Sequence, residues 1–177
     1  MPVFSKVEDF REDFCGFGRC IAIDYGTRKI GIAVGDFENK IAFPDNVLFG
    51  NWRKFIDVVR AVLTEILKQN TDIVVIGLPK KLDGSEDEKC LFVRKLADEL
   101  VRQNDNLKIF LIDERFSTKA TQSWVRFEYG TMKKKFNEKV GCKKDKKPDD
   151  ASAASILLDT FFGMATNYFN TNIVRLK

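Results

Sequence analysis

The chain contains no histidine among its 177 residues. A serine–histidine triad, a cysteine–histidine pair and a histidine general base are therefore excluded. The four cysteines have no CxxC spacing and no histidine to complete a zinc set, so we interpret them as free thiols without a metal role. They are Cys15, Cys20, Cys90 and Cys142. Any chemistry must use carboxylates, lysines, hydroxyls or a bound metal ion.

Long apolar runs are also missing, since none approaches the roughly 18 to 20 residues that a membrane span needs. Residues 1–20 mix acidic and basic side chains and lack the basic, apolar, small-residue order of a secretory signal. We therefore expect a cytoplasmic protein with no membrane partner. With 44% hydrophobic and 32% charged residues, a chain of this length favours one compact domain.

The positive charge is concentrated in one segment. Residues 131–148 hold eight lysines against Glu138 and Asp145, whereas the net charge of the whole chain is only +4. Such a segment can contact a phosphate backbone and release counterions, which makes Lys143 and Lys144 candidate substrate contacts. A solvated, flexible lysine-rich loop explains the same composition equally well.

Three short strands are predicted near the start of the domain, after an N-terminal extension over residues 1–18. Residues 19–24 and 29–34 form two β-patterned segments around the turn at 25–28, and a third strand lies within 40–48, bounded or interrupted by Pro44. Successive strands of this kind favour an antiparallel meander.

Helices and strands alternate in the rest of the chain. Helical spacing begins after Asn51, a predicted N-cap, and Ser85 with Glu88 fits a capping box. The expected elements are helices over 52–67, 85–101 and 117–125, a last helix that starts at 148–150 and runs over 151–164, and strands over 73–76 and 109–112. The order β-β-β-α-β-α-β-α-α predicts an α/β fold with a mixed five-stranded sheet and helices on both faces. We expect one folded domain over residues 19–167, with the lysine-rich loop at 131–148 inside it, and a C-terminal tail over 168–177.

Acidic residues follow two of these strands and open the last helix. Asp24 ends the first strand, Asp113 and Glu114 end the fifth, and Asp149 and Asp150 precede the Ala-rich helix. Ligands commonly bind at the carboxyl ends of strands in open α/β sheets. Any one of these acids alone is more often a turn former or a helix cap.

If these carboxylates converge, they need a cation or a proton. Two of them about 4 Å apart repel by roughly 1 kcal/mol in water and by about 4 kcal/mol at an effective dielectric constant of about 20. Oxygen donors without histidine or thiolate favour Mg²⁺ or Mn²⁺. Such ions activate water for hydrolysis of a phosphodiester.

Four segments resemble the YqgF family of pre-16S rRNA nucleases and Holliday junction resolvase-like proteins. They are DYGTRKIGIA from Asp24, GLP from Gly77 with DGS from Asp83, DERFST from Asp113, and DASAASILL from Asp150. The resemblance implies a ribonuclease H-like fold. It implies Asp24 and Glu114 as catalytic and metal-binding residues at strand ends, completed by an aspartate of the last helix. Asp150 matches that place, with Asp149 as its rival.

The basic residues depart from the family pattern at one point. The family often has arginine before the Ile-Gly of its second strand, whereas Lys29 stands there in this chain and Arg28 precedes it. Both are retained as candidate substrate contacts. Arg115 either contacts the substrate or pairs with a nearby acid.

The leading hypothesis is a metal-dependent nuclease that cleaves structured RNA by two-metal hydrolysis, in 5′-end processing of pre-16S rRNA, with pre-ribosomal particles as partners. A Holliday junction resolvase-like DNA endonuclease is one alternative, and it requires a symmetric dimer, whereas we expect a monomer or a weak dimer. A non-catalytic RNA-binding maturation factor is another. Phosphotransfer of the sugar-kinase kind needs a second lobe, for which 177 residues leave no room.

Overall fold

The computed structural model describes residues 3–4, 18–50, 52, 54–117 and 150–173, with side chains for all of these except 116–117, 150 and 166–173. Its elements are the strands β1 (Val3–Phe4), β2 (Arg19–Tyr25), β3 (Lys29–Asp36), β4 (Ile41–Phe49), β5 (Ile73–Leu78) and β6 (Lys108–Asp113), the helices α1 (Phe55–Gln69), α2 (Glu88–Gln103) and α4 (Asp150–Ile173), and the 3-10 helix η2 (Glu114–Ser117).

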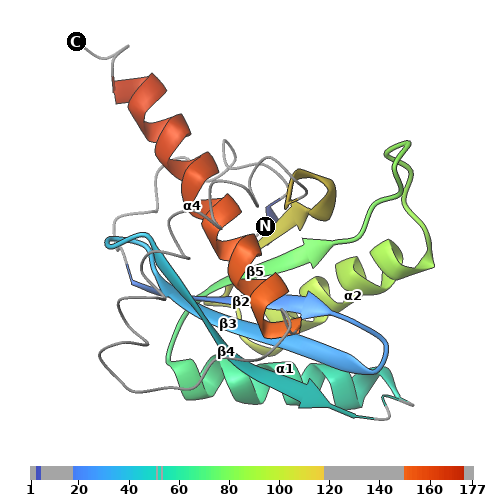
Figure 1. The fold of residues 1–177 in the computed structure, drawn as a ribbon. Helices are drawn as coiled ribbons and strands as arrows, with labels where there is room; N and C mark the ends of the chain where they lie inside the picture. The colour runs from blue at the N-terminus through green and yellow to red at the C-terminus, as the bar shows by residue number, and fades with distance from the viewer. Residues whose placement is uncertain (1–2, 5–17, 51, 53, 118–149, 174–177) are drawn as a thin grey trace, which may run out of the picture.

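One mixed sheet organises the described residues, in the order β1-β6-β5-β2-β3-β4 (Figure 1). Strands β2, β3 and β4 form the predicted antiparallel meander, and β5 and β6 continue the sheet in parallel with β2. The α/β architecture is confirmed.

The predicted number of strands is wrong, because the sheet has six strands in place of five. The additional strand is β1, which lies in the segment expected to be an N-terminal extension and pairs in parallel with β6. Phe4 stacks on Phe110 with ring centroids 5.4 Å apart. A two-residue strand is too short to display a period-2 pattern, so only its tertiary pairing reveals it.

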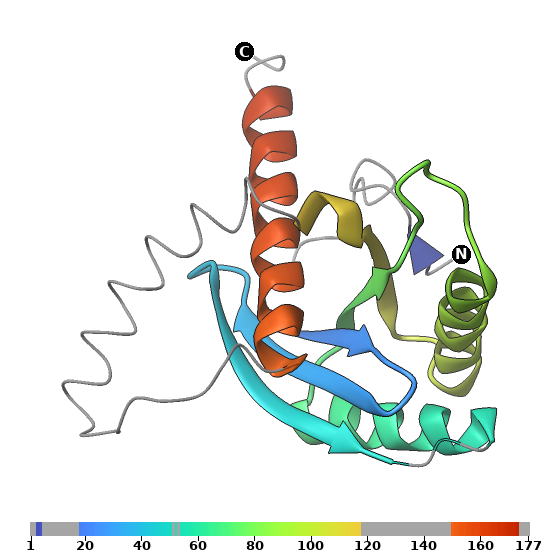
Figure 2. The ribbon, with the colours of Figure 1, turned by 45° about the vertical axis from the view of Figure 1, so that its right-hand side comes forward.

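Helices cover both faces of the sheet, as predicted. Figure 2 shows α4 on one side, with α1 and α2 on the other. Along β2, Ile21 and Ile23 pack in the core on the α1 and α2 side, while Cys20 and Ala22 pack in the core under α4. Strand β5 is buried along its whole length, which explains its continuous apolar sequence.

Helix boundaries differ from the predicted ones. The N-cap of α2 is Asp87, whose side chain accepts hydrogen bonds from the backbone N–H groups of Lys89 and Cys90, so the Ser85 capping box is wrong. The Ser85 hydroxyl instead donates to Asp83 in the preceding turn. Helix α1 begins at Phe55 without a side-chain cap, and Asn51 lies outside the described residues.

The last helix is longer than predicted, since α4 extends to Ile173. Its first residue, Asp150, lies within the expected start at 148–150. The short helix expected over 117–125 and the lysine-rich segment over 131–148 lie outside the described residues. Within the described part of the chain, no helix is long and apolar enough to cross a membrane.

Strand β4 is an edge strand with an irregularity in its middle. Asn46 pairs with Ile32 and Pro44 pairs with Ala33, so Asp45 is an extra residue in the ladder. Proline has no N–H to donate, and a bulge of this kind accommodates it. The predicted interruption at Pro44 is therefore a shift of register within one continuous strand.

Asp159 of α4 is a partly buried acid whose Oδ2 atom is buried without a hydrogen-bond partner. Burial raises the pKa of its carboxyl to about 7. The folded state therefore binds more protons than the unfolded state between about pH 4 and pH 7, and the free energy of unfolding falls as the pH rises through that range.

We predict that Asp159→Asn removes this loss of stability. The variant should be more stable than the wild type above pH 7, by at most about 4 kcal/mol, and the difference should disappear near pH 4. Urea unfolding at a series of pH values measures it. Asp98→Asn, at an exposed position of α2, is the control and should keep the wild-type pH dependence. Parallel pH profiles for wild type and Asp159→Asn would contradict the prediction.

Candidate active site

Asp24 lies near the carboxyl end of β2 on the face of the sheet that α4 covers. Successive side chains of a strand point to opposite faces. Because Ala22 packs under α4 and Ile23 packs on the opposite side, Asp24 belongs to the α4 face. Its neighbour across the β2–β3 ladder is Gly31, which has no side chain to cover the carboxylate.

Glu114 lies directly after β6 and begins η2. In the sheet, β5 separates β2 from β6, so the backbones that carry the two acids are about 10 Å apart. Gly77 of β5 makes room for the glutamate side chain between them. A Cβ atom on Gly77 would lie 2.5 Å from Glu114 Oε1 and 3.0 Å from Leu157 Cδ1. The Glu114 carboxylate therefore lies against the backbone of the intervening strand.

The electrostatics of the two acids are coupled. The pKa of Glu114 is raised to about 7, first by burial and then by the negative charges of Asp24 and Asp113, while Lys89 acts in the opposite direction. The two carboxylates therefore lie close enough for the negative charge of Asp24 to raise the pKa of Glu114, as their predicted convergence implies. Nothing in the sequence pointed to Lys89, because only the packing of α2 beside the sheet brings it near Glu114.

Asp113 has a different environment from its neighbour. Arg115 donates from Nε to Asp113 Oδ1 at 3.0 Å and from Nη2 to Oδ2 at 2.7 Å. These hydrogen bonds lower the pKa of Asp113. Arg115 Nη1 also lies 3.4 Å from the carbonyl oxygen of Leu82. The sequence left two roles open for Arg115, a substrate contact or an ion pair with a nearby acid. The structure contains the ion pair, and its partner is Asp113.

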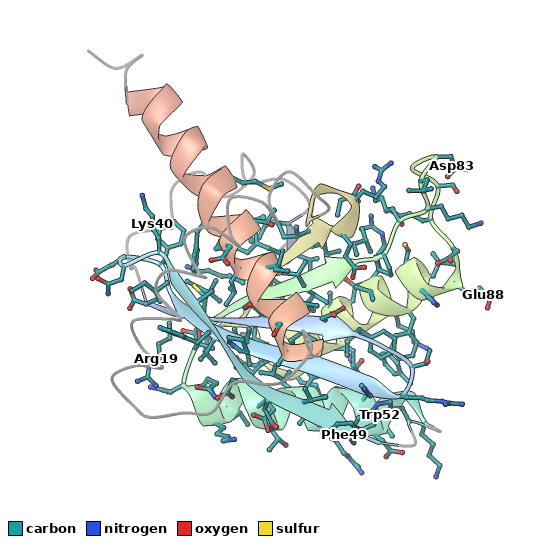
Figure 3. The ribbon with its side chains drawn as sticks, viewed as in Figure 1. Arg19, Lys40, Phe49, Trp52, Asp83 and Glu88 are labelled. Carbon is teal, nitrogen blue, oxygen red and sulfur yellow. The ribbon has the colours of Figure 1, made fainter. Side chains whose placement is uncertain are left out.

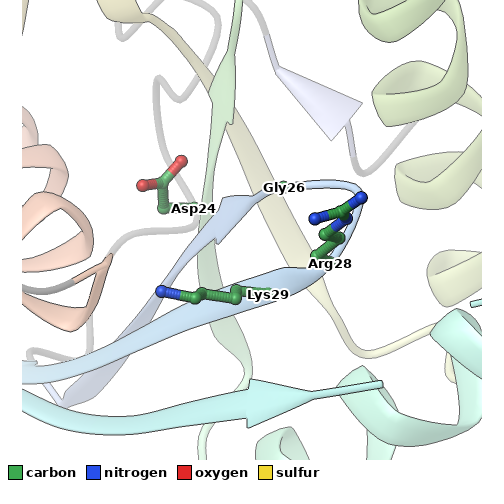
Figure 4. Close-up of a pocket in the computed structure, with 4 residues that line it drawn as sticks. All are labelled: Asp24, Gly26, Arg28 and Lys29. Carbon is green, nitrogen blue, oxygen red and sulfur yellow. The ribbon is translucent and has the colours of Figure 1, made fainter. Parts of the chain in front are cut away.

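A hollow of about 290 Å³ opens beside Asp24 at the β2–β3 turn (Figure 4). Its lining consists of Asp24, Gly26, Arg28 and Lys29. The side chains of Asp24 and Lys29 point to the same side, toward α4 (Figure 4). Gly26 closes the turn by donating from its N–H to the carbonyl oxygen of Lys29 at 2.9 Å. A Cβ atom on Gly26 would lie 2.8 Å from that oxygen, so a larger residue would strain the turn.

The remaining predicted site residues cannot be placed in the same way. Asp150 begins α4, but its side chain, Asp149, Lys143 and Lys144 lie outside the described residues. Among the residues that are described, no three aspartate, glutamate, histidine or cysteine side chains gather closely enough to hold a metal ion. Asp24 and Glu114 are brought together, and the third acid stays a prediction.

The fold is similar to that of Holliday junction resolvases of known structure, in agreement with the predicted ribonuclease H-like fold. The RuvC structure from Thermus thermophilus is similar with a TM-score of 0.53 at 13% identity, over 84% of this chain and 96% of that one. The fowlpox virus resolvase in complex with Holliday junction DNA has a TM-score of 0.52 at 15% identity, over 82% of this chain and 97% of that one. At these identities the likeness concerns the fold alone.

Sequence comparison identifies the family. The model of the RuvX family, described as Holliday junction resolvase, matches residues 18–164, and the chain belongs to this family, the one that the YqgF resemblance predicted. A protein of Rickettsia bellii is 37% identical over 158 residues, 89% of this chain and 94% of the relative. One of Rickettsia canadensis is 36% identical over 166 residues, 94% and 99% of the two chains.

Both relatives are named "putative pre-16S rRNA nuclease". Together with the family, they identify a nuclease, a hydrolase of phosphodiester bonds in nucleic acid. The predicted nuclease class is thereby confirmed.

We predict that Asp24→Asn lowers the pKa of Glu114, because the substitution removes one of the two negative charges that raise it. NMR titration of the Glu114 carboxyl carbon measures the change. Asp72→Asn is the control, since Asp72 is exposed at the opposite end of β5 and should leave the Glu114 titration unchanged. An unaltered Glu114 pKa in Asp24→Asn would show that the two acids are not coupled.

We predict opposite effects for two glycine-to-alanine substitutions. Gly77→Ala should lower the free energy of unfolding by about 1–3 kcal/mol, because the new methyl group displaces Glu114 and Leu157. Gly163→Ala on the exposed side of α4 meets nothing within 4 Å and should raise it by about 0.5–1 kcal/mol. Urea unfolding at constant pH measures both, and equal effects of the two substitutions would refute the packing assigned to Gly77.

Proposed function

We propose that the protein is a metal-dependent nuclease that cleaves structured RNA and acts in 5′-end processing of pre-16S rRNA. The names of the relatives support the substrate class. The observation that carries the mechanism is the pair of carboxylates, Asp24 and Glu114, that repel each other at the carboxyl ends of β2 and β6. Pre-ribosomal particles in the cytoplasm are the partners that this substrate implies.

The donors fit a hard divalent cation. Both carboxylates offer oxygen atoms, and the raised pKa of Glu114 means that a positive charge beside the pair would favour its ionised form. Mg²⁺ and Mn²⁺ prefer such oxygen ligands, whereas a zinc site would call for histidine or thiolate. In this proposal Asp150 is the third ligand. When bound, an ion of this type would supply water activation and would offset negative charge on the phosphate.

The protein's own residues have separate tasks in this mechanism. Asp24 and Glu114 would hold the cation, and Gly77 leaves the space that Glu114 occupies. Lys29, whose side chain lies on the same side as Asp24 (Figure 4), would contact a non-bridging oxygen of the phosphate chain. Arg115 positions Glu114 indirectly, because its ion pair with Asp113 fixes the residues on both sides of the glutamate. We also retain Arg28, Arg115, Lys143 and Lys144 as candidate substrate contacts.

Cleavage of a four-way DNA junction is the second candidate function. It is favoured by the family description and by the fold shared with the fowlpox virus resolvase, whose structure contains Holliday junction DNA. Paired cuts on a junction require a symmetric dimer. A protein that is a monomer or a weak dimer at working concentrations therefore favours the RNA substrate.

We predict that Asp24→Asn and Glu114→Gln each reduce cleavage of a pre-16S rRNA leader by at least about 100-fold. Substitution of residues that only hydrogen-bond to metal ligands typically reduces activity by roughly 10- to 100-fold. Asp24 and Glu114 are ligands themselves in the proposed site, so their substitution should cost more. The assay compares the leader RNA, duplex RNA and a four-way DNA junction, each with Mg²⁺, with Mn²⁺ and with a chelator. Asp105→Asn, at an exposed position in the turn before β6, is the matched control and should cleave normally.

Three outcomes separate the candidates. Preferential cutting of the junction would replace the RNA substrate with branched DNA. Cleavage by Asp24→Asn at the wild-type rate would refute the carboxylate mechanism. Salt-sensitive binding of RNA with no turnover under any metal condition would identify a maturation factor without catalysis.

A further inference from the structure

Phe49, the last residue of β4, is a large apolar side chain left in solvent. Its side chain is 72% exposed, and it lies at the same end of the sheet as Trp52 (Figure 3). Its register partner on β3 is Lys29. A largely exposed aromatic side chain does not contribute the folding free energy that its burial would give. An exposed ring beside a functional site is therefore a candidate contact surface.

The ring belongs to the same face of the sheet as the site. Lys29 Nζ lies 5.6 Å from the centroid of the Phe49 ring, in a cation–π arrangement. Lys29 also lines the hollow beside Asp24. Lys29 therefore lies between Phe49 and the hollow beside Asp24.

The backbone holds Phe49 in this place. The N–H of Gly50 donates to the carbonyl oxygen of Arg28 at 3.4 Å, which ties the end of β4 to the β2–β3 turn. The indole of Trp52 packs against Gly50 so closely that a Cβ atom there would lie 2.7 Å from the ring. These two contacts hold the backbone next to Phe49 in place, while its phenyl ring remains exposed to solvent.

We propose that Phe49 stacks on an unpaired nucleobase of the substrate while Lys29 and Arg28 contact the adjoining phosphates. This inference rests on the proposed nuclease function and specifies how its site holds the strand. An aromatic face next to two cations matches the two parts of a nucleotide, the planar base and the anionic phosphate. Structured RNA offers such bases in loops, bulges and single-stranded ends.

The same strand provides a matched control. Phe43 is also exposed, at 51%, but it pairs with Val34. Ala33, the neighbour of Val34, packs under α4, so alternation assigns Val34 and Phe43 to the opposite face of the sheet. Phe43 therefore has the chemistry of Phe49 without access to the site.

The test measures binding without cleavage, in Ca²⁺ or in a chelator. The probe is a short single-stranded RNA carrying 2-aminopurine, whose fluorescence is quenched by stacking on an aromatic ring. Phe49→Ala should weaken binding by about 5- to 100-fold and relieve the quenching, because one base stack contributes that much to affinity. Phe49→Trp should retain both, which also verifies that the position tolerates substitution. Phe43→Ala should bind as the wild type does.

The salt dependence separates the ring from the cations. Phe49→Ala should keep the wild-type slope of log affinity against log salt, whereas Lys29→Gln should reduce its magnitude by about 1. Wild-type affinity of Phe49→Ala, or an equal loss in Phe43→Ala, would overturn the proposal. So would a change of oligomeric state in Phe49→Ala with RNA binding intact, because Phe49 would then belong to a contact between copies of the chain. These readouts need no turnover, so absence of cleavage refutes the proposed function without deciding the stacking.

Discussion

The repulsion between Asp24 and Glu114 is the constraint on which the site depends. Folding places two carboxylates on the same face of the sheet, and the pKa of Glu114 is raised to about 7 by burial and by the charge of Asp24. The sheet order makes this possible, because β2 and β6 flank β5 with their carboxyl ends on one side. The core under α4 and the core beside α1 and α2 pack against the strands from both faces, so the backbone positions of the two acids follow from the packing of the sheet.

Two acids adjacent in sequence have opposite electrostatic environments. Asp113 is the end of β6 and forms a bidentate ion pair with Arg115, which lowers its pKa. Glu114, one residue later, turns toward Gly77 and Asp24, and its pKa is raised. The arginine thus neutralises the structural acid and leaves the second acid to respond to a cation.

Local pattern predicted the parts of the molecule that have a strong local signal. The continuous apolar runs of β5 and β2 identified buried strands, and Asp24 and Glu114 followed from their positions at strand ends together with the family motifs. Where tertiary contact overrides local pattern, the predictions failed. The two residues of β1 have no period of their own, and the α2 cap moved from Ser85 to Asp87 because Ser85 bonds within its own turn. The sequence showed Asp149 and Asp150 at the start of the last helix, and the family resemblance selected Asp150. The proximity of Lys89 to Glu114 and of Phe49 to Lys29 arises from packing that the sequence does not encode locally.

The irregular edge strand has a consequence for the protein at high concentration. β4 ends the sheet on one side, and a regular edge would offer its free N–H and C=O groups to a strand of another molecule. Pro44 removes one donor, and the extra residue at Asp45 breaks the spacing of the others. A strand of another molecule therefore cannot form a regular ladder of hydrogen bonds along β4. The exposed ring of Phe49 therefore ends a strand whose irregular edge is a poor template for the addition of another strand.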